Sequence, residues 1–152
     1  EETLKQRING ELLADLGNLA SRILTLAERH GGPFMGKPVL AGKLDLPAIS
    51  QHMDRLELHL ALEGIFRFVR ACNLFITEQE PWRKEGAELG GILYNLLEAL
   101  RIISILLSPF LPDTAAKISQ QLGVPQGKLK DARFRPFRGT PKKGEHLFQK
   151  VE

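Results

Sequence analysis

Two polar residues one helical turn apart have side chains suited to reading the edge of a nucleic-acid base. Asn18 and Arg22 lie four positions apart in a segment whose apolar residues recur every three or four positions. This spacing predicts an amphipathic helix with both side chains on its polar face. An asparagine amide offers donors and an acceptor, and an arginine offers a rigid fork of donors. Spacing alone leaves two interpretations open, a solvated helix face and a pair that reads an unstacked base.

The single tryptophan, Trp82, directly follows Pro81 near the expected start of a helix. Its ring either plugs the end of a helical bundle or offers a flat surface on which a base can stack. In the second case the fixed φ angle of Pro81 stiffens the backbone that presents the ring. Asn73 lies nine residues earlier in an apolar stripe. A buried asparagine must find hydrogen-bond partners, so we expect Asn73 to hold a helix end or loop in place.

A third pattern, over residues 133–138, alternates arginine with phenylalanine and proline. Such a segment suits contact with single-stranded RNA. It equally suits an extended segment whose phenylalanine rings pack on a bundle while the arginine heads stay in water. Of the two interpretations, we favour packing.

Catalytic and metal-binding patterns are missing from the sequence. It contains no phosphate-binding glycine loop and no dinucleotide fingerprint. His52 and His59 have no third ligand beside them, and we expect both to be surface residues. Cys72, the only cysteine, excludes an internal disulfide, fits a reducing compartment and is expected to be a buried, inert thiol. We therefore predict no catalytic residue, no metal ligand and no cofactor in this chain.

Length and charge bound the possible partners. The chain has 152 residues, 43% of them hydrophobic and 26% charged, which is typical of one soluble domain with its own core. Its net charge of +3 permits an anionic partner such as a nucleic acid but does not require one. The chain opens with acidic residues and lacks the short apolar run of a signal peptide.

The apolar pattern is helical almost throughout. We predict an all-α helical bundle in a single domain, residues 1–152, with helices at about 4–30, 47–78, 83–107 and 112–122 and an irregular basic tail at 123–152. The stretch 92–107 is apolar on nearly all sides, but Asn95, Glu98, Arg101 and Ser104 interrupt it. It is therefore expected to be a buried central helix and not a membrane span. Gly86, Gly90 and Gly91 suggest a ragged helix start or the close approach of another helix.

Several motifs together resemble the anticodon-binding domain of methionyl-tRNA synthetases, which are class I aminoacyl-tRNA synthetases. The resemblance covers nearly the whole chain, and its parts follow the order found in the family. The matching segments are the run 15–22 (DLGNLASR), the run 73–82 ending in Pro-Trp, the run 106–123 with its Ser-Pro-Phe-Leu-Pro turn, and the closing run 146–152.

The resemblance implies an α-helical domain appended to a Rossmann-type catalytic domain, which is absent from this chain. In the family this domain binds the CAU anticodon of methionine tRNAs, and the matching residues here are Asn18, Arg22 and Trp82, with Asn73 and Pro81 in support. The parent enzyme attaches methionine to tRNA using ATP and Mg²⁺. The implied partners are tRNA and the catalytic domain, with neither DNA nor a membrane, and the implied location is the cytoplasm.

Three positions depart from the family pattern. Thr77 stands where relatives commonly have an acidic residue, Phe75 replaces a frequent tyrosine, and Gln149 replaces a common proline.

Two other interpretations of the chain remain. The first is that it is the related domain of an isoleucine, valine, leucine or cysteine synthetase. The second is a non-catalytic helical bundle that binds other proteins.

Overall fold

The computed structural model describes residue 10 and residues 12–144, and these form five α-helices and no strand. The helices are α2 (Leu13–His30), α3 (Leu46–Asp54), α4 (Leu58–Gln79), α5 (Gly86–Leu107) and α6 (Pro112–Leu122). The described residues also form three 3-10 turns: η2 (Val39–Lys43) between α2 and α3, η3 (Pro81–Arg83) between α4 and α5, and η4 (Leu129–Asp131) after α6. The expected all-α bundle is confirmed, whereas the predicted helical residues before 10 and the tail after 144 lie outside the described residues.

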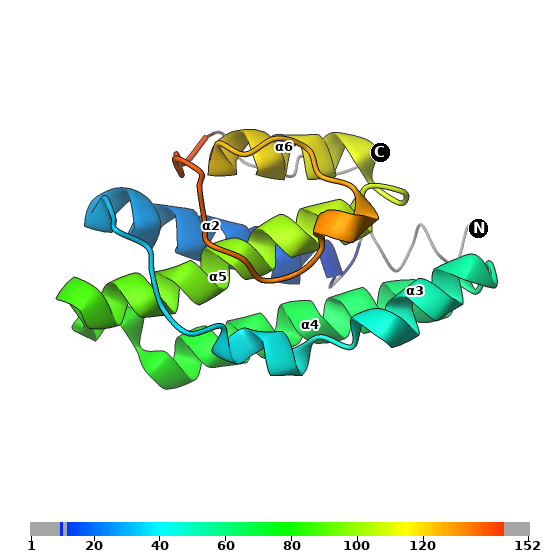
Figure 1. Ribbon diagram of the computed structural model, residues 1–152, viewed down its shortest axis with the longest axis horizontal. Coiled ribbons are helices and arrows are strands. Elements are labelled where there is room, and N and C mark those ends of the chain that lie inside the picture. The colour runs from blue at the N-terminus through cyan, green and yellow to red at the C-terminus, as the bar shows by residue number, and fades with distance from the viewer. Residues whose placement is uncertain (1–9, 11, 145–152) are drawn as a thin grey trace.

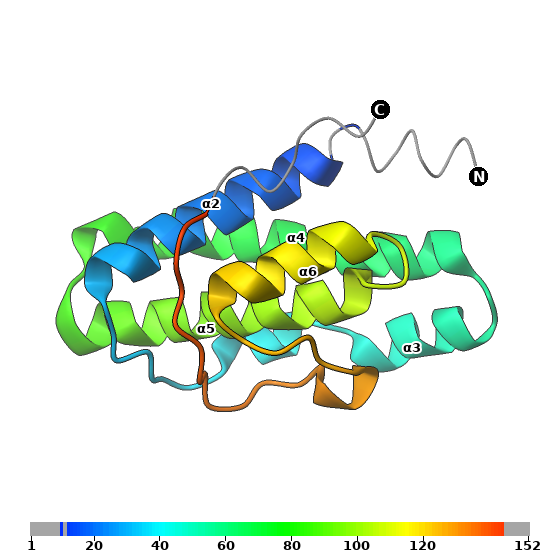
Figure 2. The ribbon, with the colours of Figure 1, turned by 90° about the horizontal axis from the view of Figure 1, so that it is seen from above.

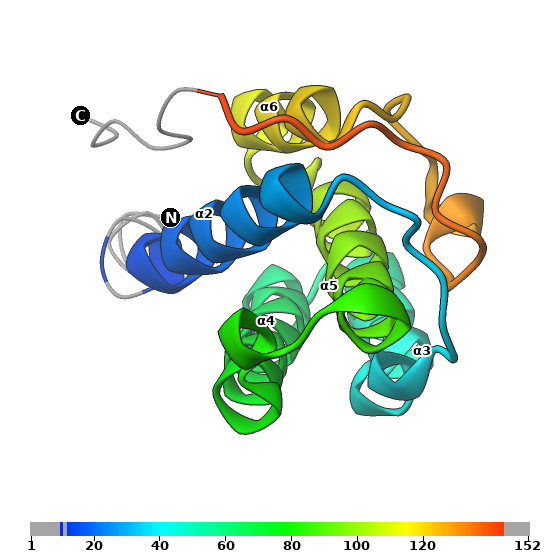
Figure 3. The same cartoon turned by 90° about the vertical axis from the view of Figure 1, so that its left-hand side faces the viewer.

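Helix α5 is the centre of the bundle. Figure 1 shows it between α6 above and α4 below, and Figure 3 shows α2, α3, α4 and α6 arranged around it. Every residue from Ile92 to Leu107 is buried. By length and composition α5 could cross a membrane, but 89% of its most apolar stretch is covered by the rest of the domain. This confirms the prediction of a buried central helix.

The predicted helix 47–78 is wrong in one respect, because the structure divides it into two antiparallel helices. Asp45 caps α3 by accepting a hydrogen bond from the Ala48 N–H (3.2 Å). Helix α3 ends at Asp54, and Leu56 adopts a positive φ of 58° that reverses the chain before α4 begins at Leu58. In the folded-back arrangement α3 packs its apolar side on α4, and this packing stabilises the reversal.

The predicted start of the third helix near residue 83 is also corrected. The residues around the Pro-Trp pair form the separate turn η3, and Lys84 and Glu85 are extended before α5 begins at Gly86. Proline fixes φ and has no N–H, so it opens a short turn that the two extended residues then end. The fourth predicted helix, 112–122, agrees with α6.

Residues 124–144, which we call the strap, are irregular apart from η4. Figure 2 shows the strap leaving α6, passing beside α5 and returning across the C-terminal half of α2. At its far end the Lys142 N–H donates to the Gln121 carbonyl (2.7 Å) and the Lys143 N–H to the Glu28 carboxylate (2.7 Å). The predicted irregular tail is therefore a fixed part of the domain over these residues.

Two neighbouring glycines at the start of α5 allow a loop, and not another helix, to approach closely. A Cβ atom at Gly90 would meet the Pro33 carbonyl oxygen at 2.6 Å, whereas one at Gly91 would make ordinary contacts, the nearest with the Met35 carbonyl oxygen at 3.5 Å. The loop 31–38 follows the left-handed Gly31 that ends α2. The two positions thus share a helix but differ in the space available.

We expect Gly90→Ala to lower the free energy of unfolding by about 1–3 kcal/mol, because the methyl group must displace loop backbone. Gly91→Ala is the matched control and should be neutral or stabilising by up to about 1 kcal/mol, since alanine favours helix. Urea unfolding followed by circular dichroism measures both values. Equal effects of the two substitutions would contradict this account of the loop contact.

Candidate nucleic-acid interface

Helix α2 presents Asn18 and Arg22 together on its outer side. The helix buries Leu16, Leu19 and Ile23 in the core, and this leaves Asn18 exposed and Arg22 partly exposed. Within the described residues no hydrogen bond or ion pair engages the Asn18 amide or the Arg22 guanidinium. Both groups are therefore available to a ligand, as the base-reading interpretation requires.

The turn η3 places Trp82 on the surface. Glu80 adopts a left-handed conformation (φ 47°), and its N–H donates to the Ile76 carbonyl (3.0 Å) to end α4. Pro81 is then buried while the Trp82 side chain is 55% exposed. The interpretation of Trp82 as a buried plug of the bundle is wrong, and the ring has an open surface on which a base can stack.

Asn73 joins α2, which carries Asn18 and Arg22, to α4, which leads into the turn that carries Trp82. Its Nδ2 atom donates to the Asp15 carbonyl in the first turn of α2 (3.2 Å), which confirms its expected role as a structural tie. Helices α2 and α4 run in the same general direction (Figure 2), so Asn18 and Trp82 both follow this joint toward one end of the domain. In the part of the chain that the structure describes, no hydrogen bond or ring contact links Trp82 to Asn18 or Arg22.

Two of the departures from the family pattern, Thr77 and Phe75, lie within the described residues. The Thr77 hydroxyl donates to the Asn73 carbonyl one turn earlier (3.2 Å), so its own helix already uses it. Phe75 is partly buried and packs against the core. Gln149 lies outside the described residues.

The aromatic residues of the strap pack, as the sequence favoured. Phe134 and Phe137 lie against the core, and the Phe137 ring meets Phe34 edge to face with centroids 6.0 Å apart. The neighbouring Arg133, Arg135 and Arg138 remain exposed. Phe134 and Phe137 therefore contribute to holding the strap, and only its cations are available to a nucleic acid.

The remaining titratable residues have structural roles. Cys72 is buried, and burial raises the pKa of its thiol, which confirms an inert cysteine. His52 and His59 pair with Glu57 and Glu63. The Lys128 backbone N–H, aided by Arg135, lowers the pKa of Asp131. Among the described residues no three potential metal ligands come together.

Because Trp82 is the only tryptophan, fluorescence reports its exposure directly. We expect acrylamide to quench the native chain strongly, because about half of the ring is open to solvent. The chain unfolded in urea provides the fully exposed reference. Emission that resists quenching until the chain unfolds would show that the ring is covered in solution, and would favour the protein-binding bundle.

Comparison with known proteins identifies the family of this chain. A family model described as the anticodon-binding domain of tRNA ligase matches residues 46–147. This match covers most of the chain, and the chain therefore belongs to the family of anticodon-binding domains of tRNA ligases.

The relatives compared below are all named as ligases of the same amino acid, methionine. The methionine–tRNA ligase of Caldanaerobacter subterraneus subsp. tengcongensis is 36% identical over 99% of this chain, and that of Clostridium perfringens is 30% identical over 99%. The methionyl-tRNA synthetase of Mycobacterium tuberculosis in its free state superposes on all of this chain with a TM-score of 0.79 and 29% identity. The chain spans 27% and 26% of the two curated relatives and 35% of the solved chain.

Proposed function

We propose that this domain reads the CAU anticodon of initiator and elongator methionine tRNAs as the C-terminal part of a methionine–tRNA ligase. The observation that carries the proposal is the exposed Trp82 ring on the Pro-Trp turn that follows α4, together with the Asn18 and Arg22 side chains of α2, which no described residue engages. An aromatic face and free hydrogen-bonding groups are what recognition of unstacked RNA bases needs.

In this mechanism the anticodon loop opens and its bases turn toward α2 and η3. Arg22 and Asn18 bind the Watson–Crick edge of the first anticodon base, and Trp82 stacks beneath it. Base–aromatic stacking stabilises such a complex by about 1–3 kcal/mol per base whatever the base. Hydrogen bonds to the base edge therefore provide the specificity, at about 1–3 kcal/mol for a good bidentate contact.

The parent enzyme would join methionine to tRNA in the cytoplasm, with ATP and Mg²⁺ bound by its catalytic domain. A second solved relative from Mycobacterium tuberculosis, in complex with methionyl-adenylate, illustrates that chemistry. In this proposal both groups belong to the catalytic domain. Its own contribution is to bind and orient the tRNA.

Binding of full-length tRNAs to the 152-residue chain tests the proposal. We expect methionine tRNA to bind at least about tenfold more tightly than isoleucine, valine, leucine or cysteine tRNAs, as one lost bidentate base contact implies. Filter binding at fixed salt measures the ratio. Preference for one of the other four tRNAs would support a different synthetase, and equal weak binding of all five would support a protein-binding bundle.

A further inference from the structure

Two arginines on α4 have no acidic partner among the residues that the structure describes. Arg67 and Arg70 are exposed, and within the described residues neither makes an ion pair or hydrogen bond. The acidic side chain one turn from Arg67, Glu63, is directed to His59 at 3.6 Å. Arg67 and Arg70 therefore present two positive charges at this surface, beside the single negative charge of Glu63.

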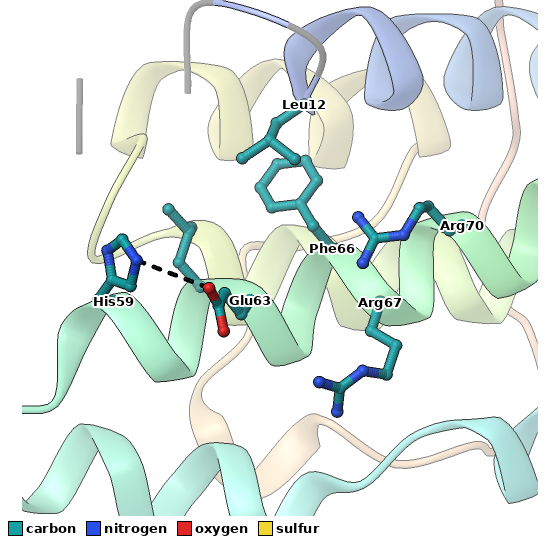
Figure 4. A pocket seen from close by; sticks show the side chains of 7 residues that line it. Leu12, His59, Glu63, Phe66, Arg67 and Arg70 are labelled. Atoms are coloured by element: carbon teal, nitrogen blue, oxygen red, sulfur yellow. Dashed lines mark ion pairs between the residues drawn. The ribbon is translucent and has the colours of Figure 1, made fainter. Parts of the chain in front are cut away.

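The two arginines border a concave site between α2 and α4. A hollow of about 160 Å³ is lined by Leu12, His59, Leu62, Glu63, Phe66, Arg67 and Arg70. Figure 4 shows the Arg70 side chain on the α2 side of α4, with its guanidinium beside Phe66, and the Arg67 guanidinium on the opposite side of α4. The guanidinium groups thus point apart, an arrangement suited to two separate anionic groups and not to one small ion.

This site lies on the line of contact between α2 and α4, which we call the seam. The proposed base-reading residues lie further along it. Arg70 lies one turn before Asn73 in α4, and Asn18 lies one turn after Asp15 in α2, while Asn73 and Asp15 are hydrogen-bonded. Since the two helices run in the same direction, Arg70 and Asn18 are separated by six residues of helical rise, about 9 Å along the seam. Trp82 lies beyond Asn18 on the side away from the arginines.

We propose that Arg67 and Arg70 bind two phosphates of the anticodon stem, so that the RNA-binding surface extends from the anticodon loop along α4. This inference rests on the proposed function. A chain that reads a loop at Asn18 and Trp82 must lie against the stem on one side of it. This side carries two guanidinium groups that no described residue engages, Arg70 beside the seam and Arg67 on the far side of α4. Guanidinium forks match phosphate oxygens, and successive phosphates supply separated anionic groups. The arginines provide attraction independent of base sequence.

The test compares the 152-residue chain with an Arg67→Gln/Arg70→Gln variant and with an Arg55→Gln/Lys117→Gln control. The control removes the same net charge from exposed cations elsewhere, at the α3–α4 turn and on α6. The probes are two anticodon stem–loops that share one stem, one with a CAU loop and one with a scrambled loop. Affinities are measured between 0.1 and 0.5 M salt, and circular dichroism establishes that each variant is folded.

We expect the Arg67/Arg70 variant to lose about tenfold in affinity at 0.1 M salt, by the same factor for both loops. The slope of log affinity against log salt should fall by about 1.4–1.8, the value for two phosphate contacts, and the control should change much less. An unchanged slope would overturn the inference and favour an acidic protein surface as the ligand. An equal loss of affinity in the control variant would show that the effect comes from net charge and not from the position of the two arginines. If the unaltered chain shows no preference for CAU, the proposed function itself fails.

Discussion

Replacement of Arg101 by alanine is expected to lower the free energy of unfolding by about 3–5 kcal/mol, several times the cost of breaking an exposed ion pair. Arg101 and Glu98 are 4% and 0% exposed and form a bidentate pair on α5, with Nε–Oε2 and Nη2–Oε1 distances of 2.9 and 2.8 Å. Without the guanidinium, a buried carboxylate remains with no countercharge. Such an uncompensated charge is far more costly than the loss of the attraction itself.

The same pair holds the strap against α5. Arg101 donates from Nη1 to the Asp131 carbonyl (2.8 Å) and from Nη2 to the Arg133 carbonyl (2.6 Å). The Glu98 carboxylate accepts from the Arg135 N–H (2.9 Å). Arg101→Ala should therefore release the strap as well as destabilise the helix, and limited proteolysis should cut residues 124–144 more readily.

Urea unfolding with two further variants separates the causes. Arg83→Ala removes an exposed ion pair with Glu80 and should cost less than about 1 kcal/mol. Glu98→Leu combined with Arg101→Met removes both buried charges and should be more stable than Arg101→Ala alone. A cost for Arg101→Ala no larger than that of Arg83→Ala would mean that the pair is not buried in solution.

The second large effect concerns RNA. We expect Arg22→Ala and Trp82→Ala each to weaken binding of a CAU anticodon stem–loop by about 1–3 kcal/mol, roughly five- to 150-fold. For Arg22→Ala most of this loss should be absent with a scrambled loop, because the guanidinium binds the edge of one particular base. Trp82→Ala removes the stacking surface. Its effect on the scrambled loop should be smaller, and the size of that effect depends on whether the scrambled loop places a base at η3.

Both variants should fold normally, because neither side chain is buried in the core and Arg22 has no partner in the described part of the chain. Thr25→Ala, one turn beyond Arg22 on α2, is a matched control and should leave the affinity unchanged. Isothermal calorimetry on the two stem–loops measures all of these values. Equal losses for the CAU and the scrambled loop in Arg22→Ala would contradict base reading.

Periodicity was sufficient for the helices and the buried centre but not for the reversals between them. Helix α5 was predictable because its apolar residues cover every side, and α6 because proline and glycine mark its two ends. The break between α3 and α4 depends on one positive φ at Leu56, a residue with no intrinsic preference for it. Tertiary packing of α3 on α4 imposes that conformation, and no local pattern records it.

The candidate site was predictable in its parts, whereas its surroundings were not. Side-chain type and spacing identified Asn18 and Arg22 as neighbours, but the exposure of Trp82 depends on how the chain turns at Glu80. In the sequence Glu98 and Arg101 were only interruptions of an apolar run, and the returning strap explains why both are buried as a pair. Arg67 and Arg70 could not be singled out from the sequence, because exposed cations are common on helices and only the fold places Arg70 beside the seam and Arg67 on the far side of α4.

The central claim is that Arg22 recognises the first anticodon base, and a double-mutant cycle tests it most directly. Affinities are measured for the chain and for Arg22→Ala with stem–loops that carry C or U at that base. We predict that the C-to-U change weakens binding to the unaltered chain by about tenfold or more, and that this penalty nearly disappears in Arg22→Ala. The same penalty in both proteins would show that Arg22 does not recognise this base, and would contradict the claim.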